Sequence, residues 1–336
     1  MQYQDVVIHT TSEVPFDVEE GMKFPPVERR LDLSDQLWVG LLDRDRAELI
    51  MDTCEPKMLK VIPSVRQFNQ RYTFVRELQD TNDPYGWDED NELTTAIILS
   101  RIVHPTGAGF DYAARIVCDQ GVVTQIVPAR IVGINTHAFL SPNRRRDWLT
   151  MDEVKVLRDL IPIKKRPLPQ RIHNALWQHE YAARAYYLDQ RWTSVCTGLE
   201  ALVHTGERKS TAHFIQRMPK LAAELGIRIS EKDASKAYAV RSQIVHGAAL
   251  QPKSQGQSTF DEKIILYDCL EDILRNAILR GMRDKIFQDI FRDDAQIENR
   301  WPLRPTNDKS CKWIHPLSSF WKGLTNSHPS PRNPRP

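Results

Sequence analysis

The sequence predicts an α+β domain over residues 1–148, followed by an all-α helical bundle over residues 169–300. Three observations predict this. Short apolar runs bounded by turn residues, typical of strands, occur in the first half. Long segments with apolar residues three and four positions apart, typical of amphipathic helices, fill the second half. Beyond residue 301, seven prolines stand among few periodic apolar residues, which predicts a mostly disordered tail over residues 301–336.

The first half mixes strands and helices. Residues 4–10 predict a strand, and residues 113–118 and 122–127 predict a hairpin around Gly121. Residues 44–55 predict a helix that ends at Pro56, and a second helix around residues 93–98 stops before Pro105. Residues 82–90 read as a polar loop. By elimination, we interpret this half as a sensing, regulatory or assembly domain.

Two features of the first half could bind a ligand, although each has a simpler interpretation that we favour. Arg101 and His104 lie one helical turn apart, so a phosphate contact is conceivable. A His at a helix end more often has only a structural role and binds no ligand. The acidic run at residues 88–92 could attract a metal, but without regular ligand spacing it reads as a solvated loop.

Residues 149–168 form a connector. Thr150 and Glu153 make a capping-box pattern for a helix that reaches Leu160. Residues 161–169 contain three prolines and three cations, which predicts an extended linker. The cations Lys164, Lys165 and Arg166 could follow RNA phosphates, whereas a solvated linker is the default interpretation.

The second half predicts five helices, over residues 170–188, 192–203, 211–225, 230–247 and 261–280. His179 lies within the apolar stripe of the first and is expected to be a hydrogen-bonded core histidine. His213, on the third, is expected to be exposed. The last helix has an apolar face wide enough for both a bundle core and a dimer seam.

The fourth helix carries the candidate catalytic residues. It begins at a Ser230 cap and ends at Gly247. Arg241 falls inside its apolar stripe, where a guanidinium needs a partner or a ligand, and we expect Glu200 to pair with it. His246 lies in the last turn, where the helix dipole favours positive charge. Such a pair could hold a phosphate and move a proton; the alternative is a structural Arg–carboxylate pair with a capping His.

The Arg-x4-His-Gly pattern in Arg241-Ser242-Gln243-Ile244-Val245-His246-Gly247, with Gly198-Leu199-Glu200-Ala201-Leu202 upstream, resembles the ApeA-like branch of the HEPN superfamily. The resemblance covers roughly residues 169 to 282. It implies a metal-independent endoribonuclease without cofactors, acting through attack by the neighbouring 2′-hydroxyl. It further implies that Arg241 stabilises phosphate charge and that His246 is the general acid or base.

The resemblance also implies supporting residues and partners. Glu200 would orient Arg241. Ser242 stands where many HEPN nucleases carry Asn, Asp or His, and its hydroxyl can still hydrogen-bond a phosphate. Arg208 and Lys209, in a polar loop, are candidate RNA contacts. A homodimer, host or phage RNA, a phage trigger or antitoxin partner, and a role in bacterial anti-phage defence are the implied context.

Two rival functions fit the same residues: a non-catalytic HEPN module that binds RNA, a nucleotide or a protein, and a purely structural dimerisation bundle. Composition excludes little. The formal charge of +2 predicts no global affinity for nucleic acid, so binding would need local patches. Five scattered cysteines predict neither a zinc site nor disulfides and fit a reducing cytoplasm. Neither a signal peptide nor a membrane span is expected.

Overall fold

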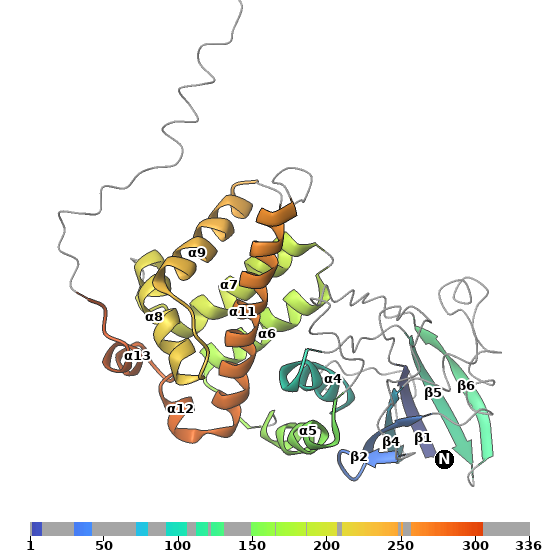
Figure 1. Ribbon diagram of the computed structural model, residues 1–336. Coiled ribbons are helices and arrows are strands. Elements are labelled where there is room, and N and C mark those ends of the chain that lie inside the picture. Colours follow the sequence, from blue (N-terminus) through green and yellow to red (C-terminus); the bar gives the residue numbers. More distant parts are fainter. Residues whose placement is uncertain are drawn as a thin grey trace, which may run out of the picture. The chain divides into compact units, whose positions relative to one another are not determined.

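The structure is a computed structural model that describes residues 2–8, 30–41, 72–79, 92–105, 112–119, 122–130, 149–164, 166–185, 187–206, 210–247, 250 and 257–304. Within these ranges the strands of an antiparallel sheet come first in the chain, interrupted by one helix at residues 92–103, and the other helices follow the last strand (Figure 1). The helix predicted at residues 44–55, the loop predicted at 82–90 and the tail from residue 305 lie outside the described residues.

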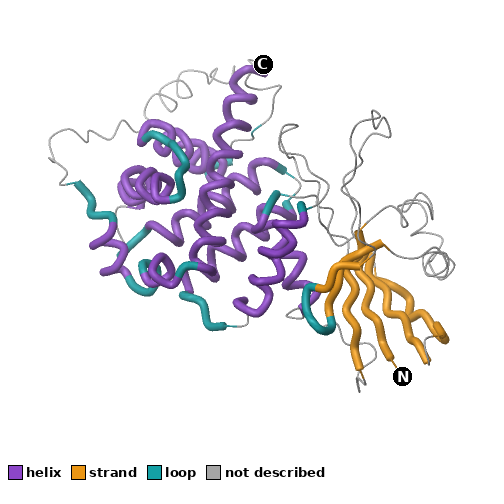
Figure 2. Tube along the Cα trace, turned by 60° about the horizontal axis from the view of Figure 1, so that its bottom comes forward, coloured by secondary structure: helices purple, strands orange, loops and turns teal. Residues whose placement is uncertain are grey.

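Six strands form one sheet in the order β2-β3-β4-β1-β5-β6, and every neighbouring pair is antiparallel (Figure 2). Their bounds are Gln2–Ile8 (β1), Arg30–Asp32 (β2), Leu37–Leu41 (β3), Tyr72–Gln79 (β4), Tyr112–Asp119 (β5) and Val122–Arg130 (β6). The predicted hairpin is confirmed, since Asp119 pairs with Val122 across residues 120–121. The first strand begins two residues earlier than predicted and places Val6 between Val75 and Ala114.

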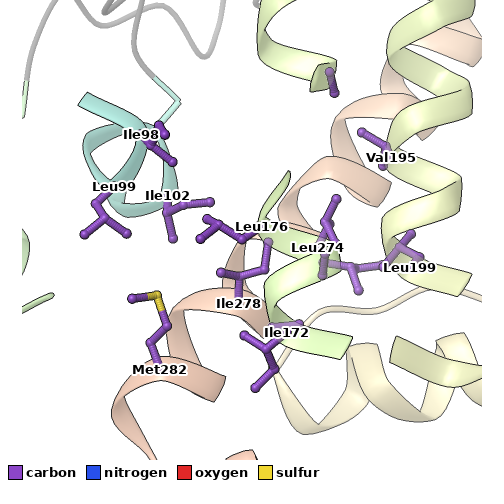
Figure 3. Packing of buried hydrophobic residues seen from close by; sticks show 14 of the residues in the cluster. Ile98, Leu99, Ile102, Ile172, Leu176, Val195, Leu199, Leu274, Ile278 and Met282 are labelled. Atoms are coloured by element: carbon purple, nitrogen blue, oxygen red, sulfur yellow. The ribbon is translucent and has the colours of Figure 1, made fainter. Parts of the chain in front are cut away.

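Helix α4 (Glu92–Val103) is buried on all sides in its second half, because every residue from Ala96 to Val103 is buried. It contacts β4, α5 (Met151–Lys164) and the long helix α11 (Gln257–Arg283). Ile102 of α4 lies beside Leu176 and Ile278 (Figure 3). A helix that is apolar all round needs neighbours on every side. Residues assigned from sequence to the first domain therefore pack directly on the helices of the second.

Polar contacts also join α4 to its neighbours. Arg275 of α11 donates to the carbonyl oxygens of Ile102 and Val103, at 3.2 and 2.9 Å, and so binds the C-terminal end of α4. Arg101 pairs with a buried carboxylate of α6, and His104 Nδ1 lies 3.4 Å from Glu153 Oε1. The favoured structural interpretation of Arg101 and His104 therefore holds, because both groups have partners inside the protein.

Helix α5 starts as predicted but ends later. The Thr150 hydroxyl accepts from the Glu153 amide at 3.3 Å and the Thr150 amide donates to the Glu153 carboxylate at 2.8 Å, which is a reciprocal capping box. The predicted linker over residues 161–169 begins too early, because α5 continues through Pro162 to Lys164, whereas residues 166–169 are not helical. Leu160 and Ile161 are buried, and their packing holds the last turn against the local effect of the proline.

The remaining helices form the rest of the core. Their bounds are Gln170–Arg184 (α6), Leu188–Val203 (α7), Ser210–Glu224 (α8), Glu231–Val245 (α9), Lys285–Asp289 (α12) and Asp294–Arg300 (α13). The break between α6 and α7 lies about four residues earlier in the structure than the sequence predicted. Ala185 is extended, and its carbonyl accepts from the buried Arg191 at 2.7 Å. This tertiary hydrogen bond fixes a break that the apolar periodicity does not reveal.

Candidate functional site

Helix α9 has the predicted caps. The Ser230 hydroxyl accepts from the Asp233 amide at 3.1 Å. The Ser230 hydroxyl also donates to the Asp233 carboxylate at 2.6 Å, which lowers the pKa of Asp233. The helix ends at Val245, with His246 as the C-terminal cap and Gly247 at φ 93°. Residues with a Cβ rarely adopt that conformation, so Gly247 allows the chain to leave the helix immediately after His246.

Contacts with α7 and α8 fix the rotation of α9 about its axis. Trp192 of α7 donates from Nε1 to the Ala237 carbonyl at 3.1 Å. The Tyr238 ring packs on Phe214 of α8, with centroids 5.4 Å apart. The predicted apolar stripe is buried at Ala234, Ala237 and Val240, whereas Val245 is 56% exposed. Val245 and His246 are therefore exposed at the end of the helix, whereas Ile244 on the same turn still packs against the core.

Arg241 and Glu200 form the predicted pair. Arg241 Nη2 donates to Glu200 Oε2 at 3.2 Å, and the two side chains are 27% and 16% exposed. The guanidinium carbon also lies 5.7 Å from the centroid of the Tyr238 ring. Arg241 is less buried than its place in the apolar stripe suggests. The carboxylate accepts from one nitrogen of the guanidinium, and the Nε–H is buried without a hydrogen-bond partner in the part of the chain that the structure describes.

His246 is exposed, and Ser242 is half-buried. The His246 amide donates to the Ser242 carbonyl at 3.1 Å, so both residues belong to the same final turn. Five helical positions separate Arg241 from His246, which corresponds to about 140° around the axis and about 7.5 Å along it. The structure thus places a carboxylate-held guanidinium and an exposed imidazole on adjoining turns of one helix.

Cys196 lies one turn before Glu200 on α7 and is completely buried. Burial raises the pKa of its thiol, and the neighbouring Glu200 carboxylate adds to this effect. The thiol therefore remains protonated and is not a nucleophile. The groups of this site that could contact a phosphate or transfer a proton are therefore those of Arg241, His246 and Ser242.

Of the five basic residues proposed from sequence as RNA contacts, the structure describes two. Lys164 is half-buried in the last turn of α5, and Arg166 is exposed two residues later. Lys165, Arg208 and Lys209 lie outside the described residues. Among the described residues, no hydrogen bond or ion pair joins Lys164 or Arg166 to Arg241 or His246.

Two other histidines were assigned from sequence, with opposite outcomes. His179 is a buried core residue whose Nε2 lies 3.1 Å from Glu271 Oε1, as predicted. The prediction that His213 is exposed was wrong. Its ring is buried, packs 4.9 Å from the ring of His204 and accepts from the Thr205 amide at 3.1 Å. The connection after α7 folds over this face of α8, which periodicity could not show.

Among the described residues, no group of three or more His, Cys, Asp or Glu side chains is arranged to hold a metal ion. No helix in the same ranges has both the length and the apolarity needed to cross a bilayer. Comparison with protein-family models, curated proteins and solved structures found no match to this chain. The geometry around Arg241 and His246 and the sequence pattern that they form are the features of this chain that indicate a function.

Proposed function

We propose that this chain is a HEPN-type endoribonuclease that cuts RNA without a metal ion, within a bacterial anti-phage defence system. The observation that carries the proposal is the arrangement on α9: Arg241 is fixed by Glu200 on one edge, and exposed His246 follows on the adjoining turn. A guanidinium with donors to spare suits a phosphate, and an exposed imidazole suits proton transfer.

In the proposed reaction, the ribose 2′-oxygen bonds to the adjacent phosphorus and loses its proton. The bond between phosphorus and the 5′-oxygen breaks, and that oxygen gains a proton. The products are a 2′,3′-cyclic phosphate and a free 5′-hydroxyl. Arg241 offsets the negative charge that accumulates on the phosphoryl oxygens. His246 carries one of the two proton transfers, and His246 of a second copy carries the other where two such helices meet in one cleft.

Cleavage of RNA by the purified chain in the presence of EDTA tests the proposal. We expect 2′,3′-cyclic phosphate ends, and a loss of rate of about 10²- to 10⁴-fold in His246→Ala. Arg241→Ala should lose about 10²- to 10³-fold. Gln243→Ala is the matched control, because Gln243 is exposed on the same turn of α9 and has no part in the proposed chemistry.

Glu200→Gln separates positioning from folding. The amide keeps a hydrogen-bond acceptor for Arg241 but removes the charge, so we expect a lower cleavage rate with a thermal midpoint close to wild type. Cleavage that persists at the wild-type rate in His246→Ala would reject the nuclease proposal. RNA binding without cleavage in the wild type would instead favour a non-catalytic module. Folding that survives His246→Ala but fails in Arg241→Ala would favour a structural bundle.

A further inference from the structure

A row of aromatic rings runs along the outer face of α6. His173, Trp177 and Tyr181 are spaced four residues apart, so each lies one turn beyond the last. The ring centroids of His173 and Trp177 are 6.2 Å apart, and those of Trp177 and Tyr181 are 6.3 Å apart with planes inclined by 33°. Trp177 Nε1 donates to His173 Nε2 at 3.2 Å, which links the first two rings. We call these three residues the aromatic row.

The aromatic row does not belong to the hydrophobic core. The core face of α6 is formed by Ile172, Ala175, Leu176, His179 and Ala182. At about 100° per residue, the aromatic row occupies an arc of about 80° on the other side of the helix. Tyr181 is 54% exposed, and His173 and Trp177 are half-buried. Tyr and Trp are enriched at interfaces, because their rings offer a large apolar face together with a polar atom that can meet water.

No carboxylate of α6 is exposed to oppose a polyanion at the aromatic row. Helix α6 contains one acidic residue, Glu180, which is buried and paired with Arg101 and Arg184. The outer face therefore presents no carboxylate of its own helix. Gln170 and Asn174 add exposed amides to it, and Arg166 is exposed just before the helix begins.

Helix α7 separates the aromatic row from the candidate site. Arg171 of α6 donates from Nη1 to the carbonyls of Ala201 and His204 on α7, at 2.8 and 2.7 Å. Glu200, the neighbour of Ala201, reaches across to Arg241 on α9. With neighbouring helix axes about 8–10 Å apart and α7 between them, the axes of α6 and α9 lie on the order of 20 Å apart. A single extended strand could occupy both places at once.

We propose that the aromatic row is a stacking surface for unpaired bases of single-stranded RNA. This inference rests on the proposed nuclease function and specifies its substrate: a strand whose bases stack on Trp177 and Tyr181 while the backbone continues toward Arg241. Stacking on an aromatic face tolerates any base, so the surface would hold RNA without reading its sequence. Bases inside a duplex cannot stack in this way, which makes the surface selective for unpaired RNA.

The test measures binding in the His246→Ala background, where cleavage does not interfere. The probe is a fluorescent pyrimidine-rich RNA of about twelve nucleotides, within the span that single-strand binding surfaces cover. We expect Tyr181→Ala and Trp177→Ala each to raise Kd by about fivefold to a hundredfold. A duplex of the same length should bind more weakly than the single strand. Ile286→Ala is the control, because it removes an exposed apolar side chain of α12 and should leave Kd unchanged.

Two further variants decide between stacking and ordinary apolar contact. Tyr181→Phe keeps the aromatic face and should bind like the parent, whereas Tyr181→Leu keeps apolar bulk and should bind as poorly as Tyr181→Ala. Unchanged Kd in Tyr181→Ala, or full binding in Tyr181→Leu, would overturn the proposal and favour a protein partner. Because Tyr181 is 54% exposed, its variants should fold and remain informative even if Trp177→Ala does not fold. Failure of the nuclease proposal is read separately, from the cleavage rate of His246→Ala.

Discussion

Arg101 of α4 and Glu180 of α6 form an ion pair of 2.7 Å in which the two side chains are 3% and 1% exposed. The same guanidinium nitrogen donates to both carboxylate oxygens, at 2.8 and 2.7 Å, and Arg184 adds a second cation to Glu180. Seventy-nine positions separate the two partners in sequence. This pair ties the helix that contacts β4 to the first helix of the bundle.

Removing Arg101 is expected to cost up to about 3–5 kcal/mol of unfolding free energy, because the buried Glu180 carboxylate keeps only the partly exposed Arg184 as an ion-pair partner. Arg101→Ala tests this by urea denaturation at pH 7. Lys155→Ala is the matched control, since Lys155 pairs with Asp152 on the surface and both side chains are well exposed. Equal denaturation midpoints for the two variants would contradict the expectation.

Acid should weaken the fold through Glu180. Burial alone would raise the pKa of this carboxyl, but Arg101 and Arg184 together hold it below its ordinary value. A lowered pKa in the folded state means that the stabilisation is complete above about pH 4.3, the ordinary value for Glu, and is lost as pH falls further. Unfolding free energies measured from pH 7 down to pH 3 should therefore decline more in the wild type than in Glu180→Gln. Glu262→Gln, an exposed carboxylate on α11, should leave the wild-type slope unchanged.

Gly198 lies where α7 approaches two other helices. A Cβ at this position would sit 2.9 Å from Leu274 Cδ2 and 3.2 Å from Gln178 Cβ. Gly198→Ala should lose stability. Overpacking costs about 1–3 kcal/mol, whereas the gain in helix propensity is only about 1 kcal/mol. The double variant with Leu274→Ala should lose less than the sum of the single changes, since the missing side chain makes room. Strict additivity in thermal unfolding would show that the contact is unimportant.

The cap of α9 should matter for the helix that carries Arg241 and His246. Ser230→Ala removes the acceptor for the Asp233 amide and is expected to cost about 0.5–2 kcal/mol. Ser235→Ala, on the exposed face of the same helix, should be neutral or slightly stabilising. Hydrogen exchange of the first-turn amides would report the loss directly. Equal exchange in the two variants would mean that tertiary packing alone holds this end.

Local signals in the sequence predicted several elements accurately. The Ser230 and Gly247 caps, the capping box at Thr150 and the hairpin around residues 120–121 all depend on residues within one turn of each other. The pairing of Glu200 with Arg241 could also be predicted. A guanidinium in an apolar stripe needs a carboxylate partner, and Glu200 lies at the edge of the apolar stripe of the preceding helix. The short helices α12 and α13 were not predicted, although Asp284 and Asp293 cap them. Each is too short for its periodicity to stand out.

The sequence by itself predicted the first strand, the β5–β6 hairpin, most of the long helices and the two ends of α9, but not strands β2 and β4 or the short helices α12 and α13. Tertiary structure decided the partner of Arg101, the break at Ala185, the continuation of α5 through Pro162 and the burial of His213. It also left Val245 and His246 exposed at the end of α9. The physical reason is range: caps and periodicity act over a few residues, whereas burial and ion pairing depend on which distant element packs against each face.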